Sequence, residues 1–141
     1  MIRCYLLTLA FLPLAGHAAD APGSECAARG RYAEEMLLSA IAKEGVTGVV
    51  RDKTKVEVLS LSPVSDAFAS QLAQADMKTG NGLSFKEYYG IYHDNGTMNL
   101  TAKYTYTNAK GARNVYIVSS LLNNDECSVR FNGYLTLSRE F

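Results

Sequence analysis

The chain has no tryptophan, and it has only two histidines, three cysteines and three prolines among its 141 residues. It has no excess charge of either sign, since the 14 basic residues equal the 14 acidic ones. A neutral chain lacks the basic surface that attracts nucleic acids and anionic membranes. So few histidines and cysteines cannot build a typical zinc site. We therefore expect no nucleic-acid partner, no metal and no cofactor.

Long hydrophobic runs are also missing, except at the amino terminus. There, Arg3 precedes an apolar run over residues 4–14, and small residues follow at 15–19. This three-part layout is typical of a secretory signal peptide. The run is too short for the roughly 20 residues that span a bilayer, which disfavours the alternative of an uncleaved anchor. The sequence predicts a signal peptide over residues 1–18 and a single domain over 19–141, periplasmic or secreted, without stable membrane insertion.

Two cysteines, Cys26 and Cys127, remain once residues 1–18 are removed. An even number of cysteines in an exported protein predicts a disulfide. The alternative is a redox pair, but the chain has no Cys-x-x-Cys motif. Closing a loop of about 100 residues stabilises a fold by up to roughly 4 kcal/mol in the chain-entropy treatment. We expect this bridge to join a first helix to a late strand.

The pattern of apolar residues predicts an α+β fold. Helical spacing follows Cys26 up to a stop at Gly45, and again after Ser62-Pro63 up to Gly80. Short extended runs are expected at residues 46–50 and 55–61, although their place in a sheet cannot be read. From residue 83 onward the period changes to two, with turns between the runs. We expect an antiparallel β-meander of four to six strands with two helices packed on one face and one disulfide.

Asn95-Gly96 is a strong hairpin signal, and it predicts that residues 85–92 pair with the strand after Thr97. In that register Tyr88 and Tyr92 lie on a solvent-facing side of the sheet, and Phe85, Ile91 and Leu100 face the helices. The outer side is then extended by further polar and aromatic side chains from these strands and from the last one: Lys86, Asn99, Thr101, Lys103, Arg130, Asn132 and Tyr134. In the last strand, Phe131, Leu135 and Leu137 are expected to face the core.

Tyrosine, arginine and asparagine on a rigid sheet suit a protein-binding surface, since tyrosine and arginine are frequent at interface hot spots. The alternative interpretation is that threonine and tyrosine simply favour strands. The predicted binding residues are Tyr88, Tyr92, His93, Asn95, Arg130 and Tyr134. The function that follows is an exported binding protein of the inhibitor or immunity type. Its partner would be another protein, such as an exported enzyme or toxin.

Two other functions stay open. One is a small-ligand carrier, with a pocket between helices and sheet lined by Phe68, Tyr89 and Tyr104. The other is a small hydrolase that uses Glu87, placed opposite Tyr104, or His93. His93 is the only histidine left after residue 18, and no Gly-x-Ser-x-Gly motif accompanies it. We therefore expect no enzymatic activity. The sequence does not determine the oligomeric state.

Overall fold

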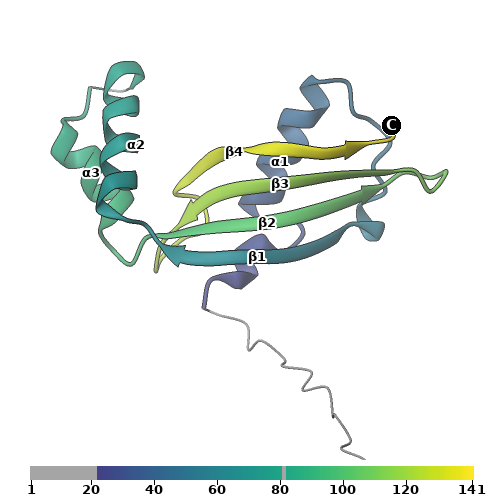
Figure 1. Ribbon diagram of the computed structural model, residues 1–141, viewed down its shortest axis with the longest axis horizontal. Coiled ribbons are helices and arrows are strands. Elements are labelled where there is room, and N and C mark those ends of the chain that lie inside the picture. Colours follow the sequence, from purple (N-terminus) through teal and green to yellow (C-terminus); the bar gives the residue numbers. More distant parts are fainter. Residues whose placement is uncertain (1–21, 81) are drawn as a thin grey trace, which may run out of the picture.

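The computed structural model describes residues 22–80 and 82–141, and Figure 1 traces its elements in chain order. The predicted signal peptide, residues 1–18, lies outside the described residues. The elements are η1 (Ser24–Ala27), α1 (Tyr32–Lys43), η2 (Arg51–Lys53), β1 (Lys55–Pro63), α2 (Asp66–Thr79), α3 (Phe85–His93), β2 (Met98–Thr107), β3 (Arg113–Leu122) and β4 (Arg130–Arg139). Both η elements are short 3-10 helices.

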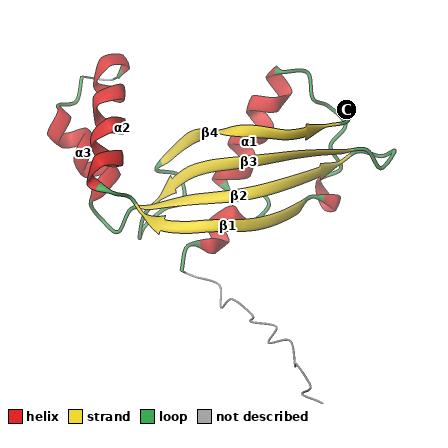
Figure 2. Ribbon diagram, viewed as in Figure 1, coloured by secondary structure: helices red, strands yellow, loops and turns green. Residues whose placement is uncertain are grey.

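The four strands form one antiparallel sheet in the order β1-β2-β3-β4. Helix α1 lies across one face of this sheet, and the α2–α3 hairpin stands at one end of it, as Figure 2 shows. The α+β class, the antiparallel meander and the Cys26–Cys127 disulfide are thereby confirmed. The structure also places residues 55–63, whose position was open: β1 is an edge strand and pairs with β2.

The main core lies between α1 and the sheet. Strand alternation sends every second side chain of β2 and β3 toward the helix, where they are buried: Leu100, Ala102, Tyr104, Tyr106, Tyr116 and Val118. Leu37 and Ile41 of α1 pack against them. We call this the covered face of the sheet. The disulfide belongs to the same core, because Cys26 is buried within it.

The largest correction concerns residues 85–93, which form helix α3 and not the predicted strand. Ser84 and Glu87 make a reciprocal capping box, in which the Ser84 hydroxyl accepts from the Glu87 amide and the Glu87 carboxylate accepts from the Ser84 amide. Tyr88 and Tyr92 are four residues apart and therefore share one helical face. Their rings lie 6.5 Å apart. The apparent alternation of apolar and polar residues in this segment arose only because its aromatic residues are closely spaced.

Asn95-Gly96 consequently makes a helix-to-strand turn. Both residues have positive φ, 58° for Asn95 and 65° for Gly96, which is the backbone that the Asn-Gly pair favours. The turn at Asn95-Gly96 was predicted correctly, but the element before it is a helix and not the predicted strand. The amide of Val64 donates to the carbonyl of Thr97 over 3.1 Å, so the chain leaves β1 and enters β2 at neighbouring points.

Several element boundaries also differ from the prediction. The first α-helix begins at Tyr32, so Cys26 lies in η1 and the disulfide ties that 3-10 turn to the loop before β4. Within residues 46–50 only Val49 makes a bridge, to Asn108. Pro63 ends β1, and Ser65 provides the N-cap of α2, accepting from the Phe68 amide at 3.2 Å. The helix ends before Gly80, where a side chain would collide with the Tyr88 hydroxyl.

Candidate binding surface

The second face of the sheet has no helix across its middle (Figure 1). We call it the open face, and its side chains include Asn99, Thr101, Lys103, Thr105, Val115, Ile117, Ser119, Asn132, Leu135 and Leu137. These alternate along β2 and β3 with the residues of the covered face. The even positions 100 to 106 of β2 are buried, and the odd positions are half-buried. One face therefore builds the core, and the other presents side chains to solvent.

The apolar side chains of the open face are concentrated in its β3–β4 half, which also carries Ser119 and Asn132. The β2 half carries threonines and Lys103, which forms an ion pair with Glu57 of β1. The β3–β4 half carries leucine, isoleucine and valine, and Leu135 and Leu137 keep 67% and 56% of their surface exposed. Leu135 pairs directly with Ile117. A shallow depression of about 420 Å³ lies over this half and is lined in part by Ile117 and Leu135.

The β-bulge at Asn132 explains why the predicted facing of β4 was wrong. The register between β3 and β4 shifts between Ser119 and Ser120 and again between Val115 and Tyr116. An extra residue in one strand turns the following side chains to the other face. Phe131 therefore still packs on the main core. Leu135 and Leu137, expected in the core, lie on the open face.

A row of hydrogen bonds crosses three strands of the open face. The Asn132 Nδ2 group donates to Ser119 Oγ over 3.0 Å, and Ser119 Oγ donates to Asn99 Oδ1 over 2.9 Å. Each bond links neighbouring strands through side chains, in addition to the backbone pairing. The row lies beside the depression, which Ser119 and Asn132 help to line. It gives the surface a fixed polar border.

The α2–α3 hairpin closes one end of the open face. Leu121 of β3 is fully buried under the hairpin's own apolar cluster, which includes Ala69 and Tyr92. Arg130 of β4 forms an ion pair with Asp76 of α2, and Tyr92 of α3 donates to the same carboxylate. Arg130 also donates to the Tyr92 hydroxyl over 3.1 Å and lies 5.4 Å from the centre of its ring. Burial, and then the bond to Asp76, raise the pKa of Tyr92.

The predicted binding tyrosines are not on this surface. Tyr88 and Tyr92 retain only 6% and 5% exposure and lie inside the hairpin, because α3 replaces the strand that would have presented them. Lys86 moves away from the sheet for the same reason. Phe85 and Ile91, expected in the core, are exposed on α3. The placement of both tyrosines on an exposed sheet face was therefore wrong.

Tyr134 lies on the covered side of β4. Its hydroxyl donates to the carboxylate of Glu44, which follows α1, and this bond raises the pKa of Tyr134 to about 12. Its ring meets that of Tyr116 edge-on at 5.8 Å. Arg139 also donates to the Glu44 carbonyl oxygen over 3.0 Å. Tyr134 thus attaches the end of α1 to β4 and does not extend the open face.

His93 and Asn95 lie at the base of the hairpin. His93 Nε2 lies 2.9 Å from Asp66 Oδ1, and His93 Nδ1 lies 3.3 Å from Asp94 Oδ1. The two carboxylates, Asp94 first, raise the pKa of His93. Asn95 donates to the Asp125 carboxylate over 2.7 Å, which joins the hairpin base to the loop between β3 and β4.

The residues named for a hydrolase do not meet. Glu87 caps the first turn of α3, and hydrogen bonds from the side chain and backbone of Ser84 lower its pKa. His93 lies at the other end of the same helix. Tyr104, predicted opposite Glu87, is buried beneath α1.

The residues named for a carrier pocket do not meet either. Phe68 and Tyr89 pack in the hairpin cluster, whereas Tyr104 belongs to the main core. The hairpin thus separates side chains that the predicted strand would have brought together.

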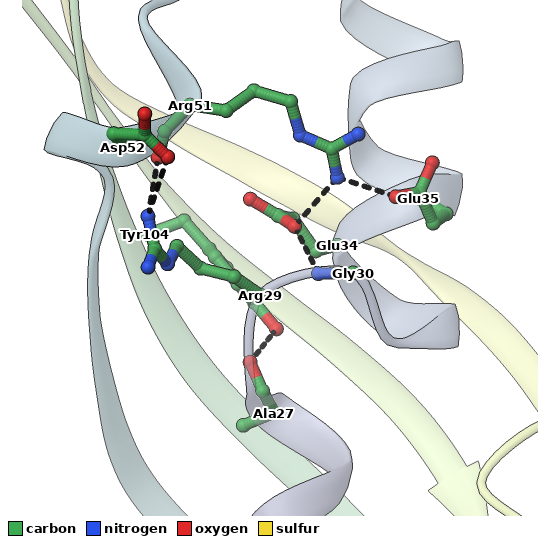
Figure 3. A network of polar contacts seen from close by, with 8 residues as sticks. All are labelled: Ala27, Arg29, Gly30, Glu34, Glu35, Arg51, Asp52 and Tyr104. Atoms are coloured by element: carbon green, nitrogen blue, oxygen red, sulfur yellow. Dashed lines mark hydrogen bonds and ion pairs between the residues drawn. The ribbon is translucent and has the colours of Figure 1, made fainter.

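Sequence reasoning also missed a polar network beside α1, shown in Figure 3. The fully buried carboxylate of Glu34 accepts from the Gly30 amide over 2.6 Å and from Arg51 Nη2 over 3.1 Å. Arg51 also forms an ion pair with Glu35. Nearby, the Tyr104 hydroxyl donates to the Ala27 carbonyl oxygen over 2.7 Å. Glu34 and Arg51 are 17 residues apart, and no local pattern links them. The network attaches η2 to α1.

Within residues 22–80 and 82–141, no group of three or more histidine, cysteine, aspartate or glutamate side chains could hold a metal ion. In the same part of the chain, no helix is both long enough and apolar enough to cross a membrane. Comparisons with protein-family models, curated proteins and solved structures found no significant match to this chain. The surface itself is therefore the basis for a functional proposal.

Proposed function

We propose that this chain is an exported binding protein of the inhibitor or immunity type, which blocks another exported protein, an enzyme or a toxin, through the open face. The observation that carries the proposal is the exposure of Leu135 and Leu137 on a rigid sheet. Apolar side chains that project together from a fixed surface are typical of protein interaction sites. The sequence motivates export, and blocking an enzyme requires only a complementary surface.

The shape of the open face supports this proposal over the carrier. The depression above Ile117 and Leu135 is shallow and lies on a sheet surface, whereas ligand pockets enclose most of a small molecule. The apolar half is bordered by the polar row Asn99–Ser119–Asn132. Apolar side chains beside fixed hydrogen-bonding groups occur together in protein interfaces. We propose neither a cofactor nor a catalytic residue.

Site-specific photo-crosslinking tests the proposal. A photoreactive phenylalanine analogue replaces Leu135 in one variant and Lys43, on the outer side of α1, in a control variant. Both positions are exposed, so the fold should tolerate the replacement. The variants are illuminated in the exported fraction of the cells that produce them. We expect a discrete adduct with one other protein from position 135 and none from position 43.

A second pair of variants makes the outcome quantitative. Leu135→Ser with Leu137→Ser should weaken binding of the crosslinked partner at least tenfold, because both side chains lie in the apolar half. The matched control, Leu59→Ser, removes an exposed leucine from β1 and should leave binding unchanged. Adducts of equal yield from positions 135 and 43, or unaltered binding by the double variant, would show that the open face is not the binding surface.

A further inference from the structure

The sheet has two edge strands, and they differ in how they are protected. Edge strands expose unpaired backbone groups, and proteins block them with charges, prolines and bulges. β1 has all three: Lys55 and Glu57, a bulge at Leu59, and Pro63 at its end. This edge is poorly suited to pairing with another strand.

β4 also has bulges, but it lacks the other two protections. From Phe131 to Ser138 it contains neither a charged residue nor a proline. Among the residues that the structure describes, the backbone of β4 makes hydrogen bonds only to β3. Bulges lie at Asn132 and Leu137, and they leave a regular stretch over residues 133–136 between them. An uncharged, unpaired stretch of this kind favours the addition of a further strand.

We propose that β4 pairs antiparallel with β4 of a second copy of this chain, giving a twofold-symmetric dimer with a continuous eight-stranded sheet. An antiparallel edge is complementary to itself, because a twofold axis places the same backbone groups opposite one another. The pairing rests on the uncharged backbone of residues 133–136, because the arginines at the two ends of β4 are engaged within the chain. Arg130 binds Asp76, and Arg139 binds Glu44.

The helices enlarge the contact beyond the strand pair. In Figure 1 the end of α1 and the α2–α3 hairpin both extend past β4. The end of α1 is attached to this strand, since Arg139 and Tyr134 both bind Glu44. A specific interface buries about 1,200 Å² or more in total, which a strand pair alone does not reach. The projecting helices provide the additional surface.

The dimer also completes the open face. Leu135 and Leu137 are among the most exposed apolar residues of the chain, and they lie at the margin of a single sheet. Pairing through β4 moves this margin to the centre of the eight-stranded sheet, where four leucines form one patch. The proposal goes beyond partner binding, because it concerns the edge of β4 and not the open face itself.

Sedimentation equilibrium of the purified protein, from micromolar to millimolar concentration, tests the dimer. We expect a species of twice the mass of one chain. Thr136→Lys places a charge on the covered side of β4, next to the proposed edge, and should raise the dimer dissociation constant at least tenfold. The matched control, Leu59→Lys, places the same charge on β1 and should leave that constant unchanged. Circular dichroism checks that each variant is folded.

Ile117→Lys separates edge pairing from packing of two open faces. Ile117 lies on the open face of the inner strand β3, so this change disrupts face-to-face packing and leaves the β4 edge intact. A monomer at every concentration would overturn the proposal. It would also be overturned by a dimer that Ile117→Lys abolishes and Thr136→Lys spares. The crosslinking test at position 135 stays distinguishable, because a contact within the dimer gives an adduct of twice the mass of one chain, whereas a different partner gives an adduct that contains another protein.

Discussion

The covered and open faces are made by alternate residues of the same strands, yet they differ in almost every physical respect. The covered face consists of buried aromatic and aliphatic side chains that pack against Leu37 and Ile41 of α1. The open face carries threonines, a polar row across three strands and two largely exposed leucines. One face therefore builds the core, and the other presents side chains to solvent. Substitutions should separate these two roles.

The largest effect is expected from the disulfide, which belongs to the covered face. Replacing Cys26 and Cys127 by alanine opens a loop of 101 residues and should lower the free energy of unfolding by about 4 kcal/mol, following the chain-entropy relation. Urea denaturation of the oxidised protein and of the double variant measures this difference. A loss below about 1 kcal/mol would mean that the packing of η1 holds this end of the core without the bridge.

A matched pair of leucines compares the two faces directly. Leu37→Ala on the covered face removes a fully buried side chain and should cost about 3 kcal/mol, since it leaves a cavity. Leu135→Ala on the open face should change stability by less than about 0.5 kcal/mol. Urea titration of both variants under one set of conditions gives the comparison. Equal losses would show that the open face contributes to the core.

The smallest effect is expected at His93, beside the hairpin that closes one end of the open face. Asp94 and Asp66 raise the pKa of His93 in the folded protein, so the protonated imidazole is stabilised by folding. This contribution is fully present below the unfolded-state pKa of about 6.5 and is lost as the pH rises through the higher folded-state pKa. His93→Gln should therefore destabilise the protein at pH below about 6 more than at pH above about 8. Stability curves of both proteins over this range measure the difference, and parallel curves would contradict it.

Strong local signals allowed much of the sheet to be predicted. The clean alternation from Met98 to Thr107 correctly gave β2, because a half-buried strand needs this pattern. The pairing of Cys26 with Cys127 followed from the two cysteines that remain when the predicted signal peptide, which contains Cys4, is left out. The helix at residues 85–93 was missed because Phe85, Tyr89 and Ile91 satisfied an alternating pattern. The capping box at Ser84 and Glu87 was the local signal that could have identified it.

The surface was harder to predict than the fold. Arg130 was expected to be free for binding, but the structure engages it with Asp76, which is 54 residues away. Leu135 and Leu137 were expected in the core, and the bulge at Asn132 turns them outward. Neither feature has a local signature, because ion pairs and bulges depend on which segments become neighbours.

The sequence alone determined the α+β class, the antiparallel meander and the disulfide pairing. Hydrophobic periodicity and turn residues are local properties of the sequence, and the disulfide follows from the number of cysteines outside the predicted signal peptide. Only the tertiary structure decided which face of the sheet is open and which strands lie at its two edges. Those properties depend on where α1 and the α2–α3 hairpin pack and on the register of β4 against β3. A shift of one residue in that register exchanges the two faces, and the alternation of residues along one strand does not fix it.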